Sequence, residues 1–554
     1  MIDDRLTTNY KPQTKPPVLS ISLGLSDWIV GLVVLLGSLG TGLYMAWRTR
    51  AGRDSSSFFL GGRRILWPVV GASLFATNIG AEHLVGLSGD AYRYGLSAGS
   101  VELTTFITLG IASAILFPYY LKNRVYTIPE FLELRYNRNA RIFFSGLMLL
   151  ISIMTKLAFT LFAGALVLNG VLGWNVMTTV VVTGLVVAVF TMLGGFTAVA
   201  WTDSIQAFIM ILGMAIVLFI GLDKVGGWSG LVARAPQAVH IGTTLDDPAY
   251  PFWGILATAF YAGVFYWGMD QVNVQRVLAA PNLRQARWGA MFATLLKLMP
   301  IFIFALPGVI AYALYPGLGE AESKQTFLLL INRLLPQGLR GLVLASLMAA
   351  LITSLIAVLN SVSTLVVRDF VVGYRKSISE KKQVLAGRLT ILAVTLLGIG
   401  AAWLVYKNEE GLYKYLQTIS AYLVLPVFPA ILFGIVSKKV TLKGATVSVF
   451  VGLAFATLFV IDQFAGPETG SRLFPFLHHP LTLNFGFRGL WAILITSAIL
   501  FAVSAFTPKT DPARLEKTTI NYAKRFEKFE GLKDWRLQWL LLTAVTLAIY
   551  VWLF

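Results

Sequence analysis

Apolar stretches about twenty residues long recur from one end of the chain to the other. Trp28 to Trp47 and Ile205 to Leu222 are two of them, and each is long enough to cross the hydrocarbon core of a bilayer as a helix. Hydrophobic residues make up 56% of the chain and charged residues 13%, so polar side chains are too few to cover a water-soluble protein of 554 residues. The short alternating strands of a membrane β-barrel are not found. The sequence therefore predicts an all-α integral membrane protein.

The apolar pattern predicts about fourteen membrane-spanning helices. The expected spans cover residues 25–47, 66–90, 98–121, 141–170, 175–193, 198–222, 251–275, 289–315, 338–367, 387–406, 411–436, 443–462, 487–507 and 537–554. A polar tail over 1–24 precedes them, without the basic start and short apolar core of a signal peptide, so we expect the first helix to insert uncleaved. A basic linker over 508–536 precedes the last span and is expected to lie at the membrane interface.

The formal net charge of +18 is explained by where the basic residues lie. Roughly thirty of the 45 basic residues fall in every second connection, which the positive-inside rule places in the cytoplasm. These connections cover residues 48–64, 122–141, 276–287, 368–388, 438–443 and 509–536. Because the number of expected spans is even, both termini are predicted to be extracellular or periplasmic, and no nucleic-acid partner is needed to explain the charge.

Several chemistries are excluded by residue type. The chain has no cysteine, so disulfides, thiolate metal sites and cysteine nucleophiles are absent. It has no nucleotide-binding P-loop, no HExxH motif and no plausible catalytic triad within the spans. Only four histidines are present, three of them in outer connections, which argues against a histidine metal site. We expect neither an enzyme nor an organic cofactor.

Ionisable and amide side chains inside the spans are the first candidates for a functional site, because an unpaired charge in a bilayer costs about 3 kcal/mol or more. They are Asn78, Glu82, His83, Glu102, Lys156, Asp203, Asp270, Lys297 and Gln417. Each has a structural alternative. A lone Asn or His often joins helices, and the two lysines are possible buried partners of Glu102 or Asp270. Asp203, Asp270 and Arg276 lie near predicted cytoplasmic ends, where salt bridges are common.

Ala350, Thr353 and Ser354 share one face of a predicted helix, because they are three and four residues apart. Hydroxyls in membrane helices usually bond to their own preceding turn. They become ligands for a hard monovalent cation only where the carbonyls of an unwound helix lie opposite them.

Seven stretches of the chain resemble the sodium/solute symporter family and, within it, the sodium/glucose cotransporters. They occur in order between about residues 26 and 460 and read GASLFATNIGAEHLVGLSG, YTIPEFLELRYN, TMLGGFTAVAWTDSIQ, YWGMDQVNVQR, LLKLMP, GLRGLVLASLMAALITSLIAVLNSVSTL and YLQTISAYL. The resemblance implies a LeuT-type fold with two inverted five-helix repeats at 66–222 and 251–436. One helix, 25–47, precedes the repeats and three follow, two within 443–507 and one at 537–554. The first helix of each repeat is expected to break near the midplane, at Thr77 to Gly80 and at Gly263 to Gly268.

The resemblance also implies the site residues of a sodium-driven sugar carrier in the plasma (cell inner) membrane. The implied Na+ ligands are Ala76, Ile79, Ala350, Thr353 and Ser354. The implied sugar-binding positions are Asn78, His83, Glu102, Lys156, Tyr266, Trp267, Lys297 and Gln417. The implied gating positions are Leu87, Tyr266 and Tyr413, and Asp203 matches an acid that is either structural or on the ion-exit path.

The substrate and the stoichiometry follow from the same resemblance. His83 and Gln417 match the hexose-carrying members and Lys156 matches the animal glucose carriers, which favours glucose or galactose. Leu103 and Val101 depart from the usual aromatics of the outer pocket, which indicates a roomier pocket or a different sugar. The alternatives are myo-inositol, a sialic acid or amino acid for which Lys156 would be the cation, a non-transporting sugar sensor and a passive channel. A second sodium site would need hydroxyls where this chain has Ile356 and Ala357, so one sodium per sugar is expected. The oligomeric state is left open.

Overall fold

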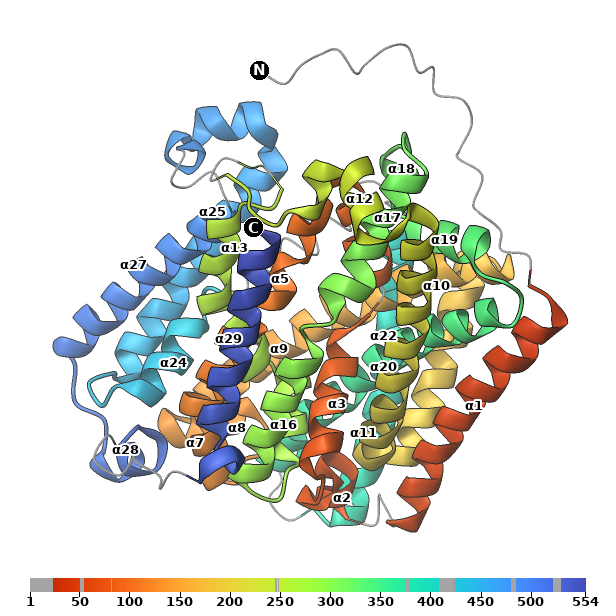
Figure 1. The fold of residues 1–554 in the computed structure, drawn as a ribbon. Helices are drawn as coiled ribbons and strands as arrows, with labels where there is room; N and C mark the ends of the chain where they lie inside the picture. Colours follow the sequence, from red (N-terminus) through yellow and green to blue (C-terminus); the bar gives the residue numbers. More distant parts are fainter. Residues whose placement is uncertain are drawn as a thin grey trace.

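A computed structural model describes residues 23–49, 54–80, 82–244, 247, 249–374, 378–407, 422, 424–479, 485–521 and 530–554. The described residues form helices joined by short connections, and none of them forms a strand (Figure 1). The prediction of an all-α protein is therefore confirmed.

Ten helices within the described residues are long and apolar enough to cross a membrane, and a bent pair raises the number to eleven. They are Leu25–Arg48, Ser88–Lys122, Arg138–Val171, Val176–Val225, Leu283–Leu314, Leu339–Tyr374, Glu380–Leu404, Leu442–Asp462, Gly486–Ala505 and Trp535–Leu553, with Phe252–Gly268 and Gln271–Leu278 as the bent pair. Helix α11 (Val176–Val225) has 50 residues and would be about 75 Å long if straight, more than twice the thickness of a bilayer core. Its backbone leaves helical geometry at Gly195 (φ 55°, ψ −164°), between the two spans predicted at 175–193 and 198–222.

The elements of the first half include several short helices in series. They are α1 (Leu25–Arg48), α2 (Ser55–Leu60), α3 (Trp67–Asn78), α4 (Ser88–Tyr94), α5 (Ser100–Leu103), α6 (Thr105–Ile111), α7 (Phe117–Lys122), α8 (Ile128–Arg135), α9 (Arg138–Ile151), α10 (Ala158–Leu172), α11 and α12 (Gly227–Arg234). Short π-helical stretches join some of them, among them Glu82–Leu87 and Ser152–Leu157.

The second half has the same character. Its helices are α13 (Phe252–Thr258), α14 (Val264–Gly268), α15 (Gln271–Leu278), α16 (Leu283–Leu296), α17 (Leu306–Leu314), α18 (Glu320–Ser323), α19 (Thr326–Leu334), α20 (Leu339–Leu365), α21 (Val372–Tyr374), α22 (Glu380–Lys407), α24 (Phe428–Val436), α25 (Leu442–Leu473), α27 (Phe485–Ala505), α28 (Pro512–Thr518) and α29 (Trp535–Leu553). Helix α25 continues well past residue 462, where the sequence predicts an outer loop. Asp462 lies buried at that point and pairs with His478 (2.9 Å) and Arg488 (2.8 Å), which bring the following chain back against the helix.

The first helix interruption falls where the sequence predicts it. Helix α3 ends at Asn78, and Ile79 takes an extended backbone (φ −89°, ψ 114°). The chain resumes as the π-helical stretch Glu82–Leu87 and then α4. The interruption leaves the last carbonyls of α3 without the partners that a continuous helix would supply.

The second interruption lies just beyond the predicted range of Gly263 to Gly268. Helix α14 runs to Gly268, and the helix axis turns by 55° before α15. Asp270 starts the new helix because its side chain accepts a hydrogen bond from the Val272 N–H at 3.0 Å. The two glycines serve close packing instead, since a Cβ at Gly263 would clash with Thr108 and one at Gly268 with Leu116.

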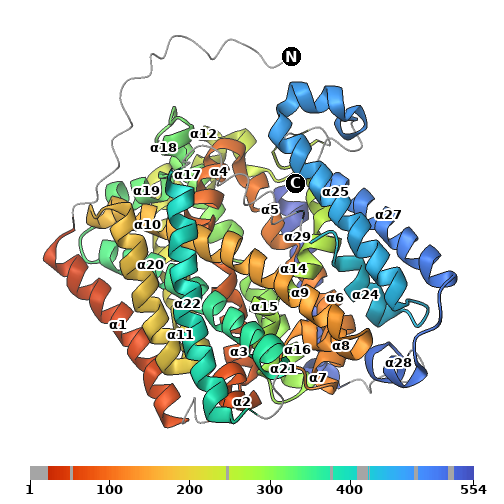
Figure 2. The same ribbon diagram turned by 180° about the vertical axis from the view of Figure 1, so that it is seen from behind.

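The described parts of the six basic connections gather at one edge of the molecule. Helices α2, α7 and α28 lie at this edge, whereas α12, α18 and the end of α29 lie at the opposite one (Figures 1 and 2). Hydrogen bonds join the connections to one another: Arg63 to the carbonyls of Arg124 (2.7 Å) and Leu278 (3.2 Å), Arg138 to Gly373 (2.8 Å), Arg135 to Val440 (2.8 Å), and Asn123 to Lys517 (3.0 Å). We call this edge the basic face.

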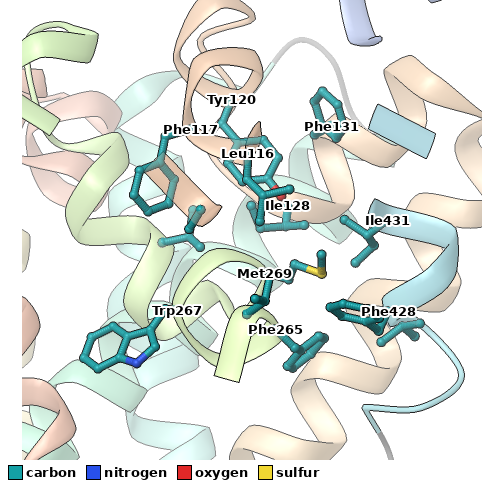
Figure 3. Packing of buried hydrophobic residues seen from close by; sticks show 14 of the residues in the cluster. Leu116, Phe117, Tyr120, Ile128, Phe131, Phe265, Trp267, Met269, Phe428 and Ile431 are labelled. Carbon is teal, nitrogen blue, oxygen red and sulfur yellow. The ribbon is translucent and has the colours of Figure 1, made fainter. Parts of the chain in front are cut away.

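An apolar layer separates the second interruption from the basic face. Met269 is fully buried among side chains from α7, α8, α14 and α24 (Figure 3). The labelled members are Leu116, Phe117, Tyr120, Ile128, Phe131, Phe265, Trp267, Phe428 and Ile431. This layer closes the space beneath the interruption on the side of the basic face.

Candidate functional site

Helix α20 meets the first interruption at Ser354. The Ser354 hydroxyl donates to the Ile79 carbonyl at 3.2 Å, and both residues are buried. Thr353 Oγ1 bonds back to the carbonyls of Ala349 (3.0 Å) and Ala350 (2.9 Å), the usual arrangement for a membrane threonine. The structure thus brings the Ser354 hydroxyl of α20 against the Ile79 carbonyl at the interruption.

The expected cation ligands fit a hard monovalent ion. The carbonyls of Ala76, Ile79 and Ala350 and the hydroxyls of Thr353 and Ser354 are all neutral oxygens, and all five residues are buried. Oxygen ligands suit hard cations, and freed carbonyls at a broken membrane helix are a recurring place for Na+.

A polar network joins five elements next to this interruption. Lys297, at the end of α16, contacts both Glu102 of α5 and Asn78 at the end of α3. His83 Nε2 lies 3.2 Å from Glu102 Oε1, and Asn78 donates to the Tyr266 hydroxyl at 2.9 Å. The Lys297 side chain is only 2% exposed, so Glu102 is the partner that neutralises it away from water.

The second lysine has a different carboxylate partner. Lys156 lies in the π-helical stretch Ser152–Leu157 and contacts Asp270 at the second interruption. Its ammonium also lies 5.2 Å from the centre of the Tyr266 ring, a cation–π distance. Each lysine thus has a carboxylate partner: the buried Lys297 pairs with Glu102, and the partly exposed Lys156 pairs with Asp270.

Two aromatic residues line the same region. The rings of Tyr266 and Trp267 are 5.3 Å apart and nearly perpendicular, and Lys297 lies 6.0 Å from the Trp267 ring. Asn273 donates to the Tyr266 carbonyl at 2.9 Å. A polar, net-neutral network beside an aromatic face is suited to a solute with many hydroxyl groups.

Asp203 takes part in a buried ion pair. It is fully buried on α11, 3.4 Å from Arg276 of α15, and accepts hydrogen bonds from Ser73 (2.6 Å) and Thr77 (3.3 Å) of α3. Arg276 also donates to Thr77 at 2.7 Å. This arrangement favours the structural interpretation of Asp203 over an isolated acid.

Some expected positions stand apart. Gln417 and Tyr413 lie outside the described residues. Leu87 is half-buried at the end of the π-helical stretch and packs in an apolar cluster.

Two contributors were not predicted. Asn273 holds Tyr266, and Ser73 holds Asp203; both are buried. Of the two, only Asn273 could have been recognised from the sequence. It lies three positions after Asp270, in the first turn of the restarted helix, where polar contacts are common. Ser73 gave no sequence signal, since an isolated serine in an apolar helix has many possible roles.

Comparisons with known proteins agree with this geometry. The model of the sodium:solute symporter family matches residues 58–452. The chain is 31% identical to sodium/glucose cotransporter 1 of Ovis aries, over 87% of this chain and 79% of that protein. It is 30% identical to the sodium/myo-inositol cotransporter of Homo sapiens, over 86% of this chain and 73% of that protein. Among solved structures, a substrate-bound, outward-open Na+-coupled sialic acid symporter with a novel Na+ site shares the fold. Its TM-score is 0.74 at 20% identity, covering 88% of this chain and 99% of that one.

The buried pair of Glu102 and Lys297 predicts strong coupling between these two residues. Glu102→Gln alone leaves the Lys297 ammonium buried without its carboxylate and should destabilise the protein by about 3–5 kcal/mol. Glu102→Gln combined with Lys297→Met removes both charges and should cost clearly less than the two single changes added together. Unfolding of the purified protein by heat or denaturant measures the cycle, and additive losses would contradict the pairing.

Proposed function

Because the chain belongs to the sodium:solute symporter family, we propose that it carries a hexose, glucose or galactose, into the cell by alternating access. It is a multi-pass membrane protein, and Na+ is the coupling ion. The substrate and ion sites of such carriers typically lie where membrane helices are interrupted, and the described residues include two interruptions near the candidate site.

We infer that Na+ is held by the carbonyls of Ala76, Ile79 and Ala350 and the hydroxyls of Thr353 and Ser354. The contact between Ser354 and the Ile79 carbonyl supports this assignment because it joins the two elements that would share the ion. Na+ bound there would link α20 to the first interrupted helix. Binding and release of the ion would therefore affect Asn78, a proposed solute contact that is the chain neighbour of the ligand Ile79.

The single observation that carries the substrate class is the pairing of charges. Within the described part of the site, Glu102 neutralises Lys297 and Asp270 neutralises Lys156. A carboxylate-bearing solute such as sialic acid or an amino acid would need a cation with capacity left for it. A neutral polyol instead needs donors and acceptors beside an aromatic ring, which Asn78, His83 and Tyr266 would supply together with Gln417, while Trp267 packs beside the ring.

Myo-inositol is the second candidate substrate. It is also a neutral polyol, and the sodium/myo-inositol cotransporter of Homo sapiens is about as similar to this chain as the glucose carrier. Leu103 and Val101 replace the aromatics expected in the outer pocket, which favours a roomier site.

We also propose fourteen spans arranged as two inverted five-helix repeats at 66–222 and 251–436. An interrupted helix opens each range, α3 with α4 in the first and α13 with α14 and α15 in the second, which supports this layout. The gathering of basic connections on one face supports a cytoplasmic location for that face, with both termini outside in the plasma membrane.

The first prediction concerns sodium-dependent accumulation. Proteoliposomes with an inward sodium gradient should accumulate labelled glucose or galactose, whereas an equal potassium gradient should not drive accumulation. Gln417→Glu should weaken the uptake because the amide is a proposed sugar contact, and Gln237→Glu, an exposed residue of an outer connection, is the matched control. Sodium-driven uptake of myo-inositol alone would move the assignment to that polyol, and uptake without sodium dependence would rule out symport.

The second prediction concerns the ion site. Ser354→Ala removes one proposed ligand and should raise the sodium concentration for half-maximal uptake about tenfold, which corresponds to about 1.4 kcal/mol. Ser361→Ala is the matched control, because Ser361 is also a buried serine of α20 and lies outside the proposed ligand set. An equal sodium dependence in the two variants would refute the ligand assignment.

The third prediction concerns stoichiometry. Ile356 and Ala357 offer no side-chain oxygen for a second ion, so one elementary charge should move with each solute. One sodium at about 100 mV and a tenfold gradient supplies about 3.7 kcal/mol, enough for a solute gradient of a few hundredfold. Parallel measurement of current and solute uptake in reconstituted vesicles tests this, and a value near two charges per solute would disprove the single site.

A further inference from the structure

A basic pocket lies on the basic face, away from the central site. It has a volume of about 310 Å³ and is formed where three connections meet: the one before α3, the one between α7 and α8, and the one between α15 and α16. Arg63, Lys122 and Arg124 line it, and no carboxylate is found among the described residues that do so. Such a pocket concentrates positive potential and attracts anions.

The N-terminus of α16 adds backbone donors to the same pocket. Pro281, Asn282 and Leu283 line the pocket at the start of this 14-residue helix. Asn282 caps the helix by accepting from the Gln285 N–H at 3.0 Å. The N–H groups before Gln285 lie in the first turn, where a helix has no internal acceptors and its dipole favours negative charge.

Hydrogen bonds hold the Arg63 side chain in place at the pocket. Arg63 donates to the Arg124 and Val125 carbonyls at 2.7 and 2.9 Å and to the Leu278 carbonyl at 3.2 Å, so one side chain joins all three connections. Arg63 (φ 55°) and Arg124 (φ 51°) are also the two non-glycine residues with a left-handed backbone among those described. Such conformations cost free energy and persist where the surroundings enforce them.

Charges of both signs act on Arg63. Burial is the main cause that lowers the pKa of the Arg63 guanidinium, Tyr126 and Glu130 raise it, and the nearby Arg124 and Arg368 lower it to a smaller extent. Lys122 and Arg124 are exposed at the mouth, and Lys122 donates to the Glu516 carbonyl at 3.4 Å. A bound dianion would relieve the repulsion among these cations.

We propose that this pocket binds a phosphate monoester group, held by Lys122, Arg124 and the first backbone N–H groups of α16. Arg63 is the positioning residue that holds the three connections in place. A phosphate monoester carries about −1.5 to −2 charge and three acceptor oxygens at pH 7, which matches this set of donors. The group can come from a soluble metabolite or from the headgroup of an anionic lipid, because the chemistry of the contact is the same. The inference does not depend on which solute the central site carries.

The binding would act on the moving parts of a carrier. The three connections lead into α3, out of α7 and from α15 into α16, so they adjoin both interrupted helices. A phosphate bridging them would restrain these helices relative to one another.

Thermal unfolding of the full-length purified protein tests the proposal. The probe is the potassium salt of glycerol phosphate, compared with potassium chloride of equal ionic strength, and a second arm uses nanodiscs of phosphatidylcholine with and without phosphatidic acid. We expect a saturable rise in melting temperature of about 2 °C or more. Lys122→Gln with Arg124→Gln should abolish the rise, whereas Lys438→Gln with Lys439→Gln, exposed lysines elsewhere on the basic face, should leave it intact.

The arms separate the possible sources. A rise with glycerol phosphate assigns the site to a soluble phosphate, and a rise with phosphatidic acid alone assigns it to a lipid headgroup, provided that the pocket variant loses it. Line broadening of the glycerol phosphate signal in phosphorus NMR gives a second readout that does not depend on stability, and Arg124→Lys with Lys122 intact should retain part of it. No response in either arm, or an equal response in the pocket variant, would overturn the proposal.

Discussion

The buried ion pair between Asp203 and Arg276 holds the two interrupted helices together. Asp203 accepts from Ser73 and Thr77 of α3, and Arg276 extends from α15, so a single pair on α11 and α15 reaches both interruptions. An interrupted helix in an apolar medium exposes carbonyls and N–H groups that need partners. The position of these broken ends therefore depends on charges that lie too deep to be satisfied by water.

Charge pairing also shapes the solute site. Lys156 and Lys297 come from different helices, and each is paired with its own carboxylate. The site is therefore polar and close to neutral. Burying such charges has a desolvation cost, which their mutual attraction offsets only while they are paired, and removing one partner carries a large penalty. A polyol that exchanges its hydroxyls for these contacts keeps every group satisfied, whereas an anionic solute would have to compete with Glu102 or Asp270. The cation ligands proposed beside it are neutral oxygens, so a bound ion would add net charge to that part of the site.

The basic face is held together by its own hydrogen bonds, away from the candidate site. Arg135 is fully buried and donates to the carbonyls of Gly434 (2.7 Å) and Val440 (2.8 Å), which joins α8 to the end of α24. The segment that contains α28 is fastened to the same region, because the Ile520 N–H donates to the Ile435 carbonyl at 2.8 Å. The apolar layer of Figure 3 lies between these contacts and the second interruption. Opening towards this face would require both the layer and the hydrogen bonds across it to rearrange.

The central site was predictable only in part from the sequence. Polar residues within apolar spans can be recognised in the sequence as candidate site residues, because few of them are tolerated in lipid. The sequence does not indicate whether Lys156 pairs with Asp270 or with Glu102, because the pairing depends on how helices more than a hundred residues apart in the chain pack together. Ser73 was missed for the same reason, because its partner Asp203 lies 130 residues further along the chain.

The sequence by itself determined the all-helical membrane class and the connections that carry the basic residues, because both follow from the length and polarity of local segments. Its resemblance to a known family placed the first interruption between Thr77 and Gly80. Only the tertiary structure decided the second interruption and the partner of each buried charge. The glycines expected to break that helix are needed for close contact with Thr108 and Leu116, and Asp270 restarts the helix by capping it. Steric fit between helices and the neutralisation of charge in an apolar medium are properties of the packed molecule, so no local pattern could reveal them.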